Sequence, residues 1–195
     1  MMWAQRSLRV ARAARPQMFG RSYWSERARS FSAVPASGGS IDGDNFSGSM
    51  VTSKVNDLFR RWSLLSRKRN SFEAALSKNF HLEEVESDER TSIMSYDIQQ
   101  NDCHTFSSES SIHGGMLATL VTDATLLLLC ANDAKTRYAV STELNMTYMD
   151  RAATGERLKI SSSVVKVGNK LGFAEAKISN WETGAPVATG RHTVR

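Results

Sequence analysis

One apolar run, Met116 to Ala131, constrains the fold of this 195-residue chain more than any other feature. Only Asp123 and three threonines, Thr119, Thr122 and Thr125, interrupt it. A segment of this length with an internal acid is short for a membrane-spanning helix. A helix that is apolar on all sides is typical of the core of a globular protein. The sequence therefore predicts one long buried helix at the centre of the fold, and no transmembrane segment.

Segments of strand character lie on both sides of this run. Residues 82–99 hold two short alternating runs separated by a turn at Ser87–Glu89, which predicts a strand pair. Residues 100–112 are polar and lack a period, so they predict a loop. After the apolar run come four stretches of strand character, and the short turns between the last of them predict an antiparallel meander. These stretches are 137–149, 156–167, 171–181 and 186–194.

A further helix is predicted from Thr52 onward, where apolar residues recur at steps of three and four. A cluster of basic residues lies mostly on its other side. A solvated helix face is the simplest interpretation of this cluster, and contact with an anionic ligand or a membrane surface is the alternative. The order of elements predicts an α+β fold in which a curved antiparallel sheet wraps around one long helix. The basic residues are Arg60, Arg61, Arg67, Lys68 and Arg69.

The first residues have the composition of a targeting segment. Residues 1–31 hold seven arginines and one acid, Glu26, so they carry a formal charge of +6 while the rest carries −1. An Arg-rich, acid-poor amphipathic start is typical of a mitochondrial transit peptide, and a surface-binding basic helix is the alternative. We expect cleavage after Phe31, a mitochondrial matrix location, a flexible linker at 32–50 and one folded domain at 51–195. The charge of that domain gives no argument for nucleic-acid binding.

Three features of the domain could carry chemistry. His113-Gly114-Gly115 stands directly before the apolar helix, where unpaired N–H groups and the helix dipole favour a developing oxyanion. An ordinary loop-to-helix junction is the alternative interpretation. Asp123 would be buried within the helix, so it should be paired, protonated or used as a general base. Ser141–Met149 has several hydrogen-bonding side chains that could serve a site. A half-exposed strand without a functional role is the alternative interpretation.

Metal and cofactor motifs are missing from the sequence. Cys103 and Cys130 form no CxxC pair, which predicts two reduced thiols. The four histidines lie too far apart to form a local metal motif, and neither a phosphate-binding loop nor a nucleophile-elbow motif is present. We therefore expect no bound metal and no cofactor.

Taken together, three stretches resemble a known family. They are HGGMLATLVTDATLLLL, then STELNMTYMDRAATGERLKISSSVVKVGNKLGFAEAKI, and the ending ATGRHTVR. Their joint occurrence resembles the PaaI-like hotdog-fold acyl-CoA thioesterases, and among these the small mitochondrion-associated thioesterases of animals (the THEM type). The resemblance extends over about residues 52–195 and is strongest over 112–195. It implies the hotdog fold and hydrolysis of acyl-CoA.

The resemblance also implies a mechanism and an assembly. The backbone N–H of Gly114 would polarise the thioester carbonyl, and Asp123 would activate water or attack directly. Ser141 would help to hold the attacking water. Family sites lie between two subunits, which implies a homodimer, or a dimer of dimers, with His113 and Gly114 of one subunit facing Asp123 of the other.

A set of substrate contacts follows from the same resemblance. The coenzyme A moiety would lie along the YMDRAA segment and the KVGNKL turn, with Lys166, Lys170 and Arg195 near its phosphates. The implied substrate-binding residues are Gly115, Thr122, Tyr148, Met149, Asp150, Arg151, Ala152, Ala153, Lys166, Val167, Gly168, Asn169, Lys170, Leu171 and Arg195.

One difference in spacing supports an alternative function. Asp123 stands ten positions after His113, one more than the family pattern implies. One residue turns a side chain by about 100° around a helix. The alternative is therefore a catalytically impaired hotdog protein that binds acyl-CoA or a protein partner.

Overall fold

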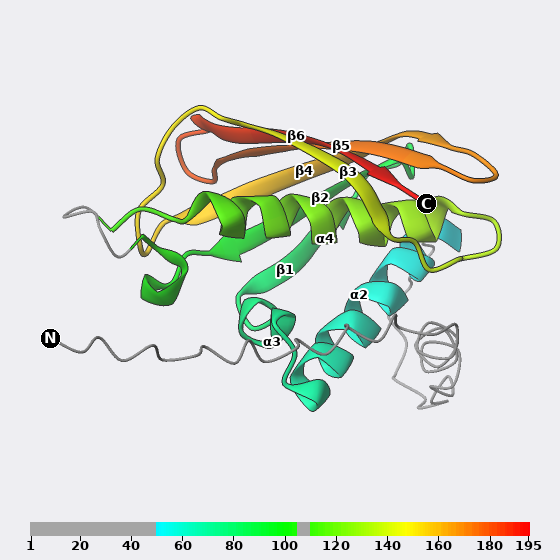
Figure 1. The fold of residues 1–195 in the computed structure, drawn as a ribbon, viewed down its shortest axis with the longest axis horizontal. Coiled ribbons are helices and arrows are strands. Elements are labelled where there is room, and N and C mark those ends of the chain that lie inside the picture. Colours follow the sequence, from blue (N-terminus) through cyan, green and yellow to red (C-terminus); the bar gives the residue numbers. More distant parts are fainter. Residues whose placement is uncertain (1–49, 105–109) are drawn as a thin grey trace, which may run out of the picture. The chain divides into compact units, whose positions relative to one another are not determined.

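The computed structural model describes residues 50–104 and 110–195 (Figure 1). The predictions for residues 1–31 and 32–50 fall outside this range, apart from Met50, which begins the first described helix. The helices are α2 (Met50–Arg69), α3 (Glu73–Leu76) and α4 (Gly114–Asn132), with a short 3-10 helix at Gln100–Asp102. The strands are β1 (Phe80–Val85), β2 (Thr91–Asp97), β3 (Ser141–Tyr148), β4 (Arg157–Val167), β5 (Gly172–Asn180) and β6 (Pro186–Val194).

The strands form one antiparallel sheet in the order β1-β2-β4-β5-β6-β3. The predicted strand pair is β1 and β2, and the predicted meander is confirmed for β4, β5 and β6. The remaining strand, β3, does not lie beside β4, its successor in sequence. It pairs with β6 at the edge of the sheet, because the connection at 149–156 crosses the sheet ends instead of closing a tight hairpin.

The strand predicted at 137–149 begins later, at Ser141. Arg137 is held outside the sheet, since its guanidinium forms an ion pair with Asp133 at 2.8 Å and donates a hydrogen bond to the Asn169 carbonyl at 2.6 Å. The Arg137 hydrogen bonds lower the pKa of Asp133. This arrangement ties the end of α4 to the turn between β4 and β5.

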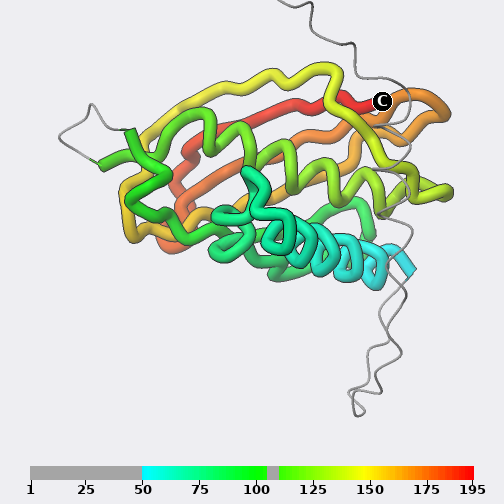
Figure 2. Tube along the Cα trace, turned by 60° about the horizontal axis from the view of Figure 1, so that its bottom comes forward, coloured from blue at the N-terminus to red at the C-terminus, as the bar shows by residue number. Residues whose placement is uncertain are grey.

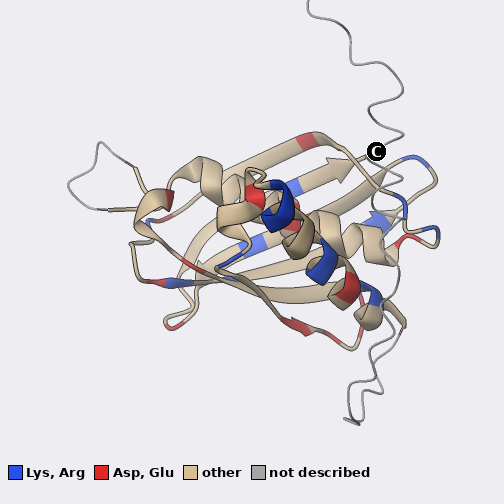
Figure 3. Cartoon of the chain, turned by 90° about the horizontal axis from the view of Figure 1, so that it is seen from below, with Lys and Arg blue, Asp and Glu red and all other residues tan. Residues whose placement is uncertain are grey.

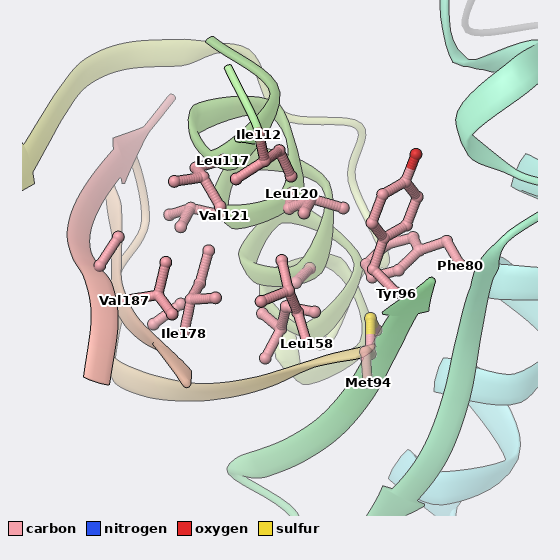
Figure 4. Packing of buried hydrophobic residues seen from close by; sticks show 14 of the residues in the cluster. Phe80, Met94, Tyr96, Ile112, Leu117, Leu120, Val121, Leu158, Ile178 and Val187 are labelled. Carbon is pink, nitrogen blue, oxygen red and sulfur yellow. The ribbon is translucent and has the colours of Figure 1, made fainter. Parts of the chain in front are cut away.

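Helix α4 lies between the sheet and α2 (Figures 1 and 2). Its Leu117, Leu120 and Val121 point toward the side chains of Leu158 and Ile178 on the sheet (Figure 4). These residues are buried, as the two-residue period of the strands predicts. By length and hydropathy α4 could cross a membrane, yet most of it is buried within the fold, as in the core helix of a globular protein.

Helix α2 packs against α4, on the side that faces away from the sheet, and against β1. Phe59 and Trp62 pack edge-on against Phe80, with ring centroids 6.0 Å and 5.8 Å away. Lys and Arg residues occur at several positions along this helix (Figure 3). Two of them have structural partners, since Arg61 pairs with Asp57 and Arg67 donates to Ser77. The basic cluster is therefore in part a structural feature of α2.

Candidate active site

The first turn of α4 presents hydrogen-bond donors. His113 is the N-cap residue, and its Nδ1 accepts the Gly115 N–H at 2.8 Å. In the neutral ring the proton must then be on Nε2, which is a second possible donor. Gly114 is the first helical residue, so its N–H has no helix carbonyl to bond. Among the described residues, no hydrogen bond uses this N–H group.

A buried hydrogen-bond network fixes this turn. The Asp102 carbonyl accepts the His113 N–H at 2.8 Å. The Asp102 carboxylate accepts the Tyr96 hydroxyl at 2.7 Å and the Gln99 N–H at 2.8 Å. Burial and the hydrogen bond to Asp102 raise the pKa of Tyr96, so the phenol remains a donor. The ring of His104 lies beside that of His113, with centroids 4.4 Å apart.

Asp123 lies on α4 and is partly buried. Its Oδ2 atom is inaccessible to solvent and has no hydrogen-bond partner among the described residues. Burial raises the pKa of this carboxyl to about 8, with a smaller contribution from the negative charge of Glu73 on α3. A carboxylic acid with such a pKa is poised to exchange a proton near neutral pH. The residue therefore has the properties of a general base.

Gly114 and Asp123 are well separated along the same helix. Nine residues of regular α-helix span about 14 Å at 1.5 Å per residue. The helix is α-helical throughout Gly114–Asn132. An oxyanion donor and a general base for one thioester must lie within a few ångströms of the same carbonyl group. These two groups of a single chain therefore cannot act on one substrate.

Ser141 is the first residue of β3 and takes part in a chain of hydrogen bonds into the core. Its Oγ lies 2.8 Å from His192 Nε2, and His192 Nδ1 lies 2.7 Å from Thr125 Oγ1. His192 and Thr125 are buried. Sequence reasoning missed both residues as site residues. The two-residue period of β6, which turns His192 to the same face as Gly190 and Val194, is the signal that could have revealed the first.

The predicted substrate-binding residues fall into two groups. The segment Tyr148–Ala153 lies beside the start of α4, where the Tyr148 hydroxyl donates to the Gly114 carbonyl at 3.1 Å and the Ala152 carbonyl accepts the Ile112 N–H. The turn Lys166–Leu171 lies at the other end of α4. There a cavity is lined by predicted residues (Val167, Gly168, Lys170, Leu171 and Arg195) and by Cys130, Arg137 and others.

Three of the predicted substrate-binding residues either lie outside the cavity lining or have hydrogen bonds within the fold. Lys166 is exposed and lies outside the cavity lining, and the Asn169 carbonyl accepts a hydrogen bond from Arg137. Thr122 on α4 donates its hydroxyl to the Ala118 carbonyl at 2.9 Å. Arg137 lines the cavity as well, and sequence reasoning missed it.

Part of this chain is similar in sequence to known thioesterases. The family model described as "Thioesterase superfamily" matches residues 109–187. Acyl-coenzyme A thioesterase 13 of Mus musculus is 39% identical over 84 residues, which are 43% of this chain and 59% of the relative. The chain thus matches less than two thirds of the length of that relative.

Solved structures share the fold. Zebrafish thioesterase superfamily member 2 is 26% identical with a TM-score of 0.62, and the match covers 74% of this chain and 97% of that one. A hypothetical thioesterase protein of Streptococcus pneumoniae, solved with coenzyme A, is 18% identical with a TM-score of 0.52, and the match covers 60% of this chain and 84% of that one. Residues 109–187 of the chain are therefore similar to the thioesterase superfamily, and its curved sheet around a central helix is the hotdog fold.

Proposed function

We propose that this protein hydrolyses acyl-CoA thioesters to a free acid and coenzyme A. The observation that carries the proposal is that one helix provides two groups, the free Gly114 N–H and the carboxyl of Asp123, whose Oδ2 atom is buried. The first suits the oxyanion of a thioester under attack, and the second suits the deprotonation of water. The names of the mouse and zebrafish relatives support the same reaction.

The chemistry follows from these groups. The thioester carbonyl oxygen accepts hydrogen bonds from the Gly114 N–H and from His113 Nε2–H. The ionised Asp123 takes a proton from water as the water oxygen bonds to the carbonyl carbon. Negative charge then develops on the carbonyl oxygen, where the helix N-terminus stabilises it. The carbon–sulfur bond breaks, and coenzyme A leaves as a thiolate, which takes up a proton.

The active site would be completed by a second copy of the chain. Gly114 of one copy can meet Asp123 of another if a two-fold axis passes beside α4 midway between them, near Ala118 and Thr119, because the two helices then run antiparallel. The edge strand β3 supports this assembly, since most of its residues are exposed and one of its edges has no partner strand among the described residues. Antiparallel pairing of two β3 strands would give a homodimer with two sites, and two such dimers could assemble further.

A substrate lying across both copies would use both predicted groups of residues. In one chain the segment Tyr148–Ala153 and the turn Lys166–Leu171 lie at opposite ends of α4, about 28 Å apart for a helix of this length. Antiparallel helices bring the first segment of one copy toward the second segment of the other. Lys170 and Arg195 of the cavity would then provide positive charge for the coenzyme A phosphates. Residues 1–31 support a mitochondrial matrix location for this activity.

Thiol release tests the proposal. The full chain is incubated with acyl-CoAs from acetyl to stearoyl and with phenylacetyl-CoA, and free coenzyme A is measured with a thiol reagent. We expect the parent protein to hydrolyse at least one of these thioesters. The Asp123→Asn variant should lose this activity, and the Thr122→Ala variant should keep more of it than Asp123→Asn does. Binding of acyl-CoA without turnover of any thioester would contradict the proposal and favour a hotdog protein that only binds its ligand.

A further inference from the structure

We infer that Thr125 and His192 fix the direction of the Ser141 hydroxyl, so that Ser141 can only accept a hydrogen bond within the active site. This inference rests on the proposed function. It makes His192 and Thr125 positioning residues for the attacking water. It also separates Ser141 from the groups that bind the thioester carbonyl.

The direction of the network is set at its buried end. Thr125 Oγ1 lies 2.6 Å from the Val121 carbonyl and 3.2 Å from the Thr122 carbonyl. A carbonyl oxygen can only accept, so the single hydroxyl proton of Thr125 is used within the helix. Toward His192, 2.7 Å away, Thr125 can then only present a lone pair. His192 Nδ1 must therefore be the donor in this hydrogen bond.

The second step concerns the protonation state of His192. Its side chain is 1% exposed, and burial lowers its pKa, which favours the neutral ring. A neutral imidazole carries one proton, and that proton is on Nδ1. Nε2 is then a bare acceptor 2.8 Å from Ser141 Oγ. The Ser141 hydroxyl must donate its only proton to His192.

The consequence concerns what Ser141 can bind. With its proton used toward His192, Ser141 presents only lone pairs on its other side. Its partner must be a donor, such as an O–H of the attacking water, and not the carbonyl oxygen of the thioester. A water that donates one proton to Ser141 keeps a lone pair free for the carbonyl carbon. The oxyanion is left to the donors of Gly114 and His113.

The protonation of His192 can be observed directly by nuclear magnetic resonance. In ¹⁵N-labelled full-length protein, long-range ¹H–¹⁵N spectra distinguish a protonated from a bare ring nitrogen, and a His192→Gln variant identifies the His192 signals. We expect the proton on Nδ1 and a bare Nε2. Thr125→Val removes the acceptor without changing the shape of the side chain, and should abolish this preference, whereas Thr125→Ser should preserve it. The control is Thr119→Val, because Thr119 bonds only its own helix at Gly115 in the hydrogen bonds described for it, and this variant should leave the His192 signals unchanged.

Kinetics test the positioning role. We expect Thr125→Val to lower kcat roughly 10-fold or more with little change in KM, because the water is misplaced while substrate binding is intact, and Thr125→Ser to restore it. A proton on Nε2 in the parent protein, or an unchanged kcat in Thr125→Val, would overturn the inference. If the parent protein hydrolyses no acyl-CoA, the proposed function fails, while the spectra still decide the direction of the hydrogen bonds.

Discussion

Asp123→Asn is expected to lower kcat by about 10²- to 10⁴-fold, the usual contribution of a general base. Asparagine keeps the shape of the side chain but cannot take a proton from water. Burial raises the pKa of Asp123 to about 8, so the parent enzyme should gain activity as the pH rises and level off above about pH 8. Initial rates of thiol release between pH 6 and about pH 9 measure both effects. A variant that keeps the rate of the parent would remove Asp123 from the mechanism.

The same substitution should stabilise the fold. The pKa of Asp123 is about 8 in the folded protein against 3.8 in the unfolded chain, so the folded state binds more protons between these values. The stability of the parent is then highest at acid pH and falls by up to about 1.4 kcal/mol per pH unit toward pH 8. Asparagine has no proton to lose, so the Tm of the variant should exceed that of the parent by a margin that grows from about pH 4 to pH 8. The control is the same substitution at an exposed position of α2, Asp57→Asn. Overlapping curves of Tm against pH for the parent and Asp123→Asn would contradict the account.

Gly114→Pro should lower kcat/KM by about 10²- to 10³-fold, as loss of an oxyanion donor does. Proline removes the N–H group and is well tolerated as the first residue of a helix. His113 is already extended, with φ −70° and ψ 134°, as the residue before proline must be. The helix should therefore form while the proposed donor is lost. Circular dichroism and thiol release measure the two outcomes.

Gly114→Ala is the matched control for this variant. A Cβ at Gly114 lies 3.3 Å from the ring of Tyr148, so both variants make the half-exposed tyrosine shift by a few tenths of an ångström. Only proline lacks the N–H group. A much larger loss in Gly114→Pro than in Gly114→Ala is expected, and equal losses would assign the effect to crowding instead of to the donor.

The sequence predicted which segments form helices and strands better than it predicted which strands pair with each other. The apolar run Met116–Ala131 predicts α4 because its hydrophobicity is local and continuous. The place of β3 depends on pairing with β6, more than forty residues later, and no local period reports such a pairing. The four residues of α3 are too few to show a helical period.

The candidate site was predictable to a similar extent. His113 and Gly114 follow from a glycine pair at a helix start, and Asp123 follows from an acid within an apolar helix. The bonds of His192 to Ser141 and Thr125 join residues 51 and 67 positions apart, so only the folded chain shows them. The geometry also shows that Gly114 and Asp123 of one chain are too far apart to share a substrate.

Complementation between two inactive variants tests the central claim, a thioesterase site built from two copies of the chain. Gly114→Pro and Asp123→Asn chains, each with a different affinity tag, are expressed together, and mixed dimers are purified through both tags. Each mixed dimer would hold one intact site and one site with both defects, so thiol release from acyl-CoA should recover to about half of the parent rate. Mixed dimers as inactive as either variant alone would contradict the account.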